Sequence, residues 1–296
     1  MSPPSTSAWR SLADAFVNAP LTKRFARQNP VLWRHFVTRC DSSATGLSLT
    51  LGVLVALVFL ALFLGIAEDV VMHDPLIVLD EKVAALAYRF RNPTLNAVML
   101  AFTDLGAWQT VLAGMVLAAI WMVLRGRAIL GIGLCVSVLM GEALVWILKG
   151  QLQRPRPSVD HALVTARGAS FPSGHAFVAF AFFGYIAWSG FRHATGAMRA
   201  VVRTSFIIIA TAVGLSRIYL GVHWPSDVLA SYLLGAAWLA TLFFVIPLIE
   251  QTGFGPRLAK SDRHPGTALA IGMVLVWSAV FFARYLSDLR GFTTAT

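Results

Sequence analysis

A histidine and an aspartate stand four residues apart in an otherwise apolar part of the chain, within residues 216–227. Pro225 lies between them and is suited to be the first residue of a helix. This spacing lets the carboxylate of Asp227 reach back to the imidazole of His223. A carboxylate that holds an imidazole in one tautomer favours its use as a nucleophile.

Two further segments carry groups that bind anions. Residues 149–157 hold Lys149 and Arg156, and Arg217 lies six residues before His223. One ammonium group and two planar guanidinium groups suit the oxygens of a phosphate. Residues 173–175 are expected at the start of a helix, where free N–H groups and the helix dipole favour an anion. Together the three segments predict a phosphate pocket.

The two histidines of these segments have different neighbours and so can take different roles. Asp227 favours the N–H-donating form of His223 alone, which we interpret as the nucleophile. His175, on the opposite side of the predicted pocket, suits a general acid for the departing oxygen. Three cations around the site would repel a divalent ion, so no metal is expected, although phosphoryl transfer often uses one.

The three segments resemble the motifs of the type 2 phosphatidic acid phosphatase superfamily. Those motifs are Lys-x6-Arg-Pro, Pro-Ser-Gly-His and Ser-Arg-x5-His-x3-Asp, and the chain matches every position in order. The resemblance covers roughly residues 47–249 and implies catalysis without a metal or other cofactor. It implies that His223 attacks phosphorus to form a phosphohistidine, that Asp227 orients it and that His175 protonates the leaving group. The residues implied to bind the phosphoryl oxygens are Lys149, Arg156, Ser173, Gly174 and Arg217.

Each of these residues has a simpler explanation when taken alone. Lys149 and Arg217 are suited to be helix-end cations that reach for the membrane surface. His223 and Asp227 are suited to cap a surface helix or to ligate zinc at i, i+4 spacing. The joint occurrence of all the motif positions at the family's spacing outweighs these explanations.

The composition places the motifs in a membrane protein. Of the 296 residues, 57% are hydrophobic and 13% are charged, which is typical of a chain that lies mostly in lipid. The formal net charge is +10, but the basic residues gather in short connections between apolar runs. They therefore indicate membrane topology rather than a nucleic acid partner. Cys40 and Cys135 are not expected to form a disulfide.

Seven apolar runs predict an all-α, polytopic bundle of transmembrane helices, with a six-helix phosphatase core and a seventh, C-terminal span. The runs are residues 47–67, 108–124, 129–148, 175–188, 201–220, 228–249 and 267–285. Between the first two, apolar residues recur at helical spacing, which predicts an amphipathic helix on the outer surface, ended by Pro93. These residues are Leu79, Val83, Leu86 and Phe90.

Charge divides the chain into three predicted parts. Residues 1–46 are basic and amphipathic, as in a cytoplasmic segment that lies on a membrane. Residues 47–249 form the expected core, and residues 250–296 a cytoplasmic loop, the seventh span and a short outer tail. The positive-inside rule puts the acidic connection after the first span outside, and both motif loops share that face. We expect a bacterial cytoplasmic (inner) membrane, with the N-terminus cytoplasmic and the site facing the periplasm or exterior.

The expected function is that of an integral-membrane lipid phosphatase whose substrate keeps its tail in the bilayer. Phosphatidate, phosphatidylglycerol phosphate and undecaprenyl pyrophosphate are candidate substrates, and the sequence does not choose between them. One alternative is a phosphotransferase that passes the phosphoryl group to an acceptor lipid such as lipid A. Another is an anion transporter that uses the cationic cluster as its binding site.

Some polar residues match no motif. Glu142 lies inside the third span and is left open between pairing in the bundle, lining a water path and selecting the substrate. The loop between the first two motifs holds candidates for contact with a lipid headgroup, namely Arg154, Asp160, His161 and Arg167.

Overall fold

The computed structural model describes residues 45–72, 76–191, 196–251 and 266–295. By its contacts the chain divides into two units, Met1–Val55 and Ala56–Thr296. The second unit contains all the motif residues. The predicted N-terminal segment, residues 1–46, lies almost wholly outside the described residues. All regular structure in the described ranges is helical, with no strand, which confirms the predicted all-α fold.

The helices follow the predicted order, with breaks that the apolar runs alone did not reveal. They are α4 (Thr45–Met72), α5 (Leu76–Arg89), α6 (Pro93–Leu105), α7 (Trp108–Leu124), α8 (Ala128–Cys135), a π-helical turn (Val136–Met140), α9 (Gly141–Leu152), a short 3-10 turn (Val159–His161), α10 (Gly174–Phe191), α11 (Gly196–Tyr219), α12 (Pro225–Gln251) and α13 (Thr267–Ala295). Pro225 and Gly174 begin helices, as predicted.

Five helical stretches in the described residues are long and apolar enough to cross a membrane: Gly52–Met72, Ala128–Leu152, Gly196–Tyr219, Pro225–Pro247 and Ala268–Phe292. A sixth results if α6 and α7, which meet at an angle of 46°, form one bent span. The predicted C-terminal span is therefore present. The run at residues 175–188 falls in α10, an 18-residue helix that is not counted among these stretches but packs between them. The 18 residues of α10 include polar side chains such as His175 and Ser189.

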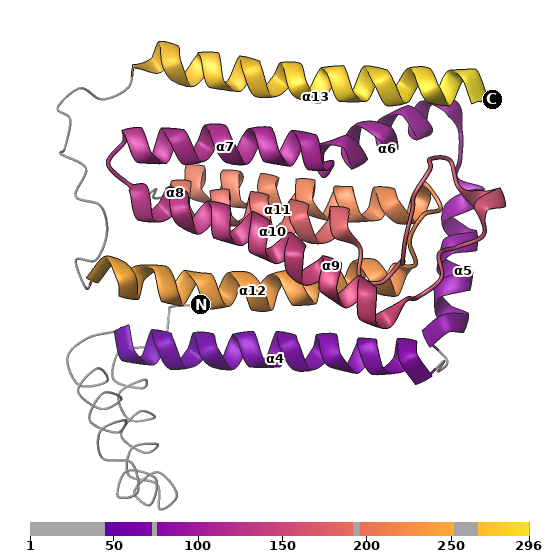
Figure 1. The fold of residues 1–296 in the computed structure, drawn as a ribbon, viewed down its shortest axis with the longest axis horizontal. Helices are drawn as coiled ribbons and strands as arrows, with labels where there is room; N and C mark the ends of the chain where they lie inside the picture. Colours follow the sequence, from indigo (N-terminus) through magenta and orange to yellow (C-terminus); the bar gives the residue numbers. More distant parts are fainter. Residues whose placement is uncertain (1–44, 73–75, 192–195, 252–265, 296) are drawn as a thin grey trace, which may run out of the picture. The chain divides into compact units, whose positions relative to one another are not determined.

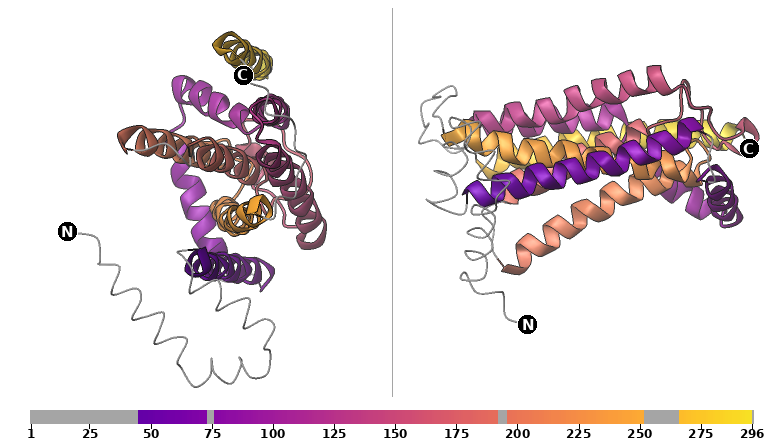
Figure 2. Two further views of the ribbon diagram at one scale, coloured as in Figure 1. Left: turned by 90° about the vertical axis from the view of Figure 1, so that its left-hand side faces the viewer. Right: turned by 90° about the horizontal axis from the view of Figure 1, so that it is seen from below.

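Helix α10 lies at the centre of the second unit, where it packs against α7, α9, α11 and α12. Its buried Phe177 and Tyr185 belong to one large apolar cluster with Leu134, Val138 and Val145 of the preceding helical segments. In Figures 1 and 2, α7, α10, α11, α12 and α13 run side by side, and α5 stands across one end of them. The motif-bearing helix ends meet near that end.

The amphipathic helix predicted before Pro93 is α5, but its apolar stripe does not face the protein. Leu79, Leu86 and Phe90 are 55%, 53% and 62% exposed, whereas Asp80 and Ala84 are buried. This places the stripe where a membrane interface would cover it. The sequence did not predict α6, which begins directly at Pro93. Its N-cap is Asn92, whose side-chain oxygen accepts from the N–H of Leu95 at 2.9 Å.

Candidate active site

The three motifs meet at a cavity of about 310 Å³ between the ends of the helices. Six of the eight predicted site residues line this cavity: Lys149, Arg156, Gly174, His175, Arg217 and His223. The other two, Ser173 and Asp227, are fully buried and do not line it. Segments far apart in the sequence are therefore brought together as the motif pattern predicted.

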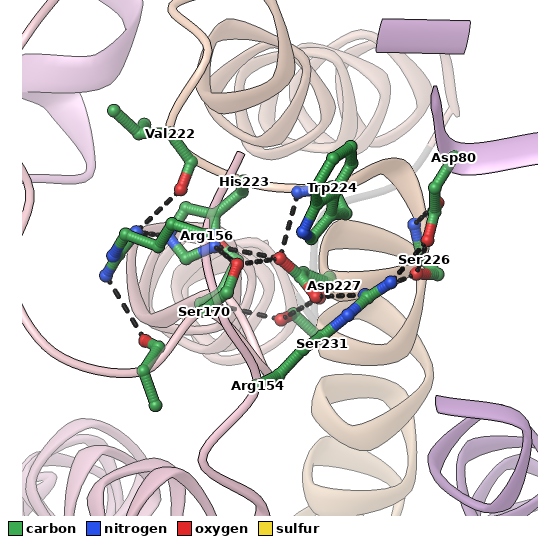
Figure 3. A network of polar contacts seen from close by, with 12 residues as sticks. Asp80, Arg154, Arg156, Ser170, Val222, His223, Trp224, Ser226, Asp227 and Ser231 are labelled. Atoms are coloured by element: carbon green, nitrogen blue, oxygen red, sulfur yellow. Dashed lines mark hydrogen bonds and ion pairs between the residues drawn. The ribbon is translucent and has the colours of Figure 1, made fainter. Parts of the chain in front are cut away.

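His223 lies in the turn between α11 and α12, and each of its ring nitrogens has a different partner. Nδ1 is 3.3 Å from Oδ2 of Asp227, and Nε2 is 3.1 Å from a terminal guanidinium nitrogen of Arg156 (Figure 3). A guanidinium can only donate, so Nε2 must be the acceptor and Nδ1 must carry the proton. Nε2 therefore carries the lone pair of the ring, and this lone pair accepts the hydrogen bond from Arg156.

The protonation of His223 follows from its surroundings. Burial, the largest cause, lowers the pKa of His223 to about 3, while the hydrogen bond and charge of Asp227 act against that change. The charges of Arg217 and Arg156 lower the pKa further. The imidazole is thus neutral at physiological pH, which is the form that a nucleophile requires.

The turn that carries His223 depends on one glycine. Gly221 has a φ of 76°, and a Cβ at this position would overlap the backbone carbonyl of His161. The N–H of Leu163 donates to the carbonyl of Leu220 at 2.9 Å, so the loop after the first motif is joined to this turn. Arg91 strengthens the junction, since it donates to the carbonyls of Tyr219 and His161, each at 2.7 Å.

Asp227 is surrounded by donors. Its Oδ2 accepts from the N–H of Trp224 at 2.9 Å and from the hydroxyl of Ser170, and its Oδ1 accepts from Arg154 at 2.5 Å. These donors fix the carboxylate that in turn fixes the imidazole. Among the described residues, no further His, Cys, Asp or Glu completes a metal-binding group with the pair.

Arg154 lies behind the site, so its predicted contact with a lipid headgroup is wrong. It is 7% exposed, and it bridges Asp227 and Asp80, the latter at 2.7 Å. Asp80 also accepts from the backbone N–H of Ser226 at 2.8 Å (Figure 3). Sequence reasoning missed Asp80 because it lies on α5, 74 residues before Arg154. The available signal was an acid in an amphipathic helix, but Glu81 and Lys82 next to it are exposed, so the sequence did not mark Asp80 as the acid that faces inward.

Lys149 and Arg156 are held by backbone carbonyls of residues 167–170. Lys149 donates to Ala169 at 2.6 Å and to Ser170 at 3.2 Å. Arg156 donates to the carbonyls of Gly168, Arg167 and Ala169 and, at 2.6 Å, to that of Val222. Burial lowers the pKa of Arg156, although a guanidinium stays charged at physiological pH. Neither cation pairs with a carboxylate of the described residues.

Arg217 reaches the cavity from the end of α11. One terminal nitrogen lies 2.5 Å from the hydroxyl of Thr103, and its buried Nε has no hydrogen-bond partner among the described residues. The residue is only 6% exposed. A buried donor without a partner is costly, so this guanidinium suits an anion that would take the remaining bonds.

The second motif forms the beginning of α10. The backbone N–H of Ser173 donates to the carbonyl of Asp227 at 3.2 Å, which ties the second motif to the third. The Ser173 hydroxyl is buried and has no partner among the described residues. Gly174 and His175 follow in the first turn of the helix, whose N–H groups have no partners within the helix.

Two of the residues that match no motif, Glu142 and Arg167, line the cavity. Glu142 lines the wall, and its buried Oε2 has no hydrogen-bond partner in the described part of the chain. Arg167 lines the cavity too, as the headgroup prediction requires, whereas Asp160 and His161 do not. The ring of His161 lies instead against Tyr88, with centroids 5.1 Å apart.

The structure thus combines a helical membrane bundle with a cavity at which a buried histidine meets three cations. A family model described as the PAP2 superfamily matches residues 130–249. Phosphatidylglycerophosphatase B of Bacillus subtilis is 33% identical over 175 residues, which are 58% of this chain and 83% of the relative. The chain therefore belongs to the PAP2 superfamily.

Other relatives are named for related reactions. An undecaprenyl-diphosphatase of Sulfolobus acidocaldarius is 30% identical, over 54% of this chain and 73% of its own length. A lipid A 1-phosphatase of Rhizobium johnstonii is 32% identical, over 40% of this chain and 48% of its own length. A crystal structure of a transmembrane PAP2-type phosphatidylglycerolphosphate phosphatase from Bacillus subtilis superposes with a TM-score of 0.60 and 30% identity. The match covers 67% of this chain and 96% of that structure.

Proposed function

We propose that the chain is an integral-membrane lipid phosphatase that works through a phosphohistidine on His223. The observation that carries this proposal is the pair of contacts on the imidazole. Nδ1 faces the Asp227 carboxylate at 3.3 Å, while Nε2 faces the cavity beside Arg156. This arrangement leaves Nε2 unprotonated beside cations, and its lone pair, which accepts from Arg156 here, would pass to phosphorus when a phosphate ester takes the Arg156 hydrogen bond.

The first half of the proposed reaction forms a bond between Nε2 of His223 and phosphorus. As this bond forms, the bond from phosphorus to the lipid oxygen breaks. His175, as the imidazolium that a bound phosphate dianion favours, gives a proton to that oxygen and becomes neutral. Lys149, Arg156 and Arg217 stabilise the charge that builds up on the phosphoryl oxygens. The buried Asp227 carboxylate stabilises the positive imidazole, because it accepts the hydrogen bond from Nδ1.

The second half returns the protein to its starting state. His175, now neutral, accepts a proton from a water molecule, and the oxygen of that water attacks phosphorus. The bond from phosphorus to Nε2 breaks, inorganic phosphate is released and His223 is neutral again. Ser173 and Gly174, at the beginning of α10, supply further donors to the phosphate.

We infer that the substrate is a lipid phosphomonoester or a lipid pyrophosphate. The relative that is matched over 83% of its own length is named for phosphatidylglycerophosphate, and the two others reported above are named for undecaprenyl diphosphate and lipid A. Phosphatidylglycerol phosphate is therefore our first candidate, with undecaprenyl pyrophosphate second and phosphatidate third. The basic motif loops on an expected outer face support a site that faces the periplasm or exterior of a bacterial inner membrane.

A release assay tests the proposal. Purified protein in detergent is given a panel of lipid phosphates with a chelator present, and free phosphate is measured for the native chain and for His223→Ala. We expect release from at least one lipid by the native chain alone, with an acid-labile phosphoprotein trapped during turnover. Transfer of labelled phosphate to an acceptor lipid would indicate a phosphotransferase. Phosphate flux into liposomes without release would indicate a transporter.

A further inference from the structure

The C-terminal helix α13 lies outside residues 130–249, which the family model matches, yet it packs beside the turn that carries His223. Tyr285 and Leu289 pack against the apolar cluster formed by Leu100, Tyr219, Leu220 and Val222. The last of these residues directly precedes His223. Helix α13 therefore supports the turn that carries the proposed nucleophile.

Arg284 makes a polar connection from α13 to α6. Its Nε lies 3.6 Å from Oδ1 of Asp104, and a terminal nitrogen donates to Asp288 at 2.6 Å. The Asp104 side chain is only 2% exposed, and its Oδ2 has no hydrogen-bond partner among the described residues. A buried carboxylate of this kind needs a nearby positive charge.

Asp104 directly follows Thr103, whose hydroxyl contacts Arg217 at 2.5 Å. Arg217 also has a buried Nε, without a partner among the described residues, that could be attracted to a free carboxylate. Asp104 is thus a competitor for the guanidinium that should bind the substrate phosphate. Among the described residues, Arg284 is the cation that forms an ion pair with Asp104, and it also pairs with Asp288, whose carboxyl group lies beside that of Asp104.

We propose that Arg284 is a positioning residue that keeps Arg217 available to the phosphate by pairing with Asp104. The proposal rests on the proposed phosphatase function and extends it to a helix outside the matched family segment. Arg284 touches no reacting atom, and it acts through Asp104. Loss of its charge frees Asp104 to pair with Arg217, which then turns from the cavity.

The test compares Arg284→Gln, Asp104→Asn and the double variant with the native chain. The readouts are kcat/KM for lipid phosphate and the inhibition constant of orthovanadate, which mimics the five-coordinate transition state. Unlike a specific activity, an inhibition constant does not depend on how much of the protein is folded. Arg284→Gln is expected to lower kcat/KM by about 10- to 100-fold and to raise the inhibition constant of orthovanadate by about the same factor, as a misplaced binding group does.

The double variant gives the decisive result. Because a neutral amide in place of the Asp104 carboxylate would no longer compete for Arg217, adding Asp104→Asn to Arg284→Gln should restore most of the lost activity and vanadate inhibition. Arg284→Lys should also retain most of both, because it keeps the charge. A matched control is Phe282→Ala, which removes a 56% exposed side chain from the same helix and should change neither constant.

Two results would overturn the inference: native constants in Arg284→Gln, or a double variant no better than Arg284→Gln. The second would mean that Arg284 merely holds α13 in place. If the native chain releases no phosphate from any lipid, the proposed function fails. In that case, calorimetry measures the affinity of the same proteins for orthovanadate. Weaker binding to Arg284→Gln and recovery in the double variant would support the inference, and absence of binding to the native chain would overturn it.

Discussion

The two sides of the His223 imidazole use similar charged groups but pair them differently. Behind Nδ1, Asp80, Arg154 and Asp227 form a continuous chain of ion pairs, with side chains 2%, 7% and 0% exposed. In front of Nε2, the cations Lys149, Arg156 and Arg217 have carbonyl or hydroxyl partners but no carboxylate among the described residues.

This difference indicates different roles for the two sides of the imidazole. Buried ion pairs add little net stability, because desolvation offsets their attraction, but they hold groups in fixed positions. The paired side therefore orients the imidazole. The unpaired side keeps uncompensated positive charge, so we expect it to contribute to phosphate binding and to stabilise the transition state. The following predictions test this division, from the largest expected effect to the smallest.

Replacing the group shared by both sides should have the largest effect. His223→Ala removes the nucleophile, and we expect phosphate release to fall by about 10⁴-fold or more. The measurement is initial release rate with a saturating lipid phosphate. His161→Gln is the matched control, because His161 lies outside the cavity. Turnover by a folded His223→Ala protein near the native rate would disprove the assignment.

Asp227→Asn tests the paired side. The amide cannot hold the Nδ1 proton as the carboxylate does, so the lone pair at Nε2 is no longer favoured. We expect kcat to fall by about 10³- to 10⁴-fold, as in other histidines that lose an orienting carboxylate. Trapping of the phosphoprotein in a rapid-quench experiment should show that its formation is the step affected. Normal formation with slow hydrolysis would contradict this role.

His175→Asn tests the proposed proton donor on the unpaired side. Its loss should lower the rate by about 10²- to 10⁴-fold for a lipid alcohol leaving group. The loss should be much smaller for an aryl phosphate, whose leaving group needs no proton. The measurement is the ratio of the two rates in the native and variant proteins. Equal losses on both substrates would count against the role.

Arg154 and Arg156, the two arginines of residues 149–157, sharpen the comparison because they lie on opposite sides of the imidazole. Arg156→Met should lower kcat/KM by about 10²- to 10³-fold, as loss of a transition-state donor does, with little change in thermal midpoint. Arg154→Met leaves two buried carboxylates without their cation and should destabilise the fold by about 3–5 kcal/mol. Thermal unfolding in detergent and kinetics on the folded fraction separate these effects. The reverse pattern would invalidate the comparison.

Lowering the pH should have the smallest effect of the five, a gradual decrease in the stability of the fold. The pKa of His223 is lowered from 6.5 to about 3. As pH falls from 6.5 towards 3, the unfolded chain binds a proton that the folded chain excludes, so stability decreases. His223→Gln removes this contribution, and its thermal midpoint should fall less steeply over that window. A parallel fall in both proteins would show that His223 does not contribute.

Most of the fold and the motif cluster could be predicted from local pattern. Pro225 and Gly174 mark helix starts through backbone chemistry, and apolar runs located most of the long helices. The bent junction of α6 and α7 and the π-helical turn before Glu142 were not predicted, because tertiary packing decides them rather than composition. Trp238, for example, donates to the carbonyl of Ser137 inside that turn at 3.1 Å.

The parts of the site that sequence reasoning missed are pairings between distant charges. Asp80 meets Arg154 across 74 residues, and Asp104 meets Arg284 across a still longer separation. Seen alone in the sequence, Asp80 or Asp104 indicates only on which side of the membrane its connection lies. Arg154 and Arg156 have the same chemistry in adjacent Arg-Pro pairs, so only the three-dimensional structure shows that one faces Asp227 and the other the cavity.

The outward apolar stripe of α5 has a kinetic consequence. Leu79, Leu86 and Phe90 are exposed on α5, which stands across one end of the long helices in Figure 1. If a membrane interface covers this stripe, we expect the cavity mouth at the depth of lipid phosphate groups. A substrate then arrives by sliding within one leaflet and never leaves the membrane. Its effective concentration is its mole fraction among neighbouring lipids, so diluting it with inert lipid should slow the reaction when dilution with buffer does not.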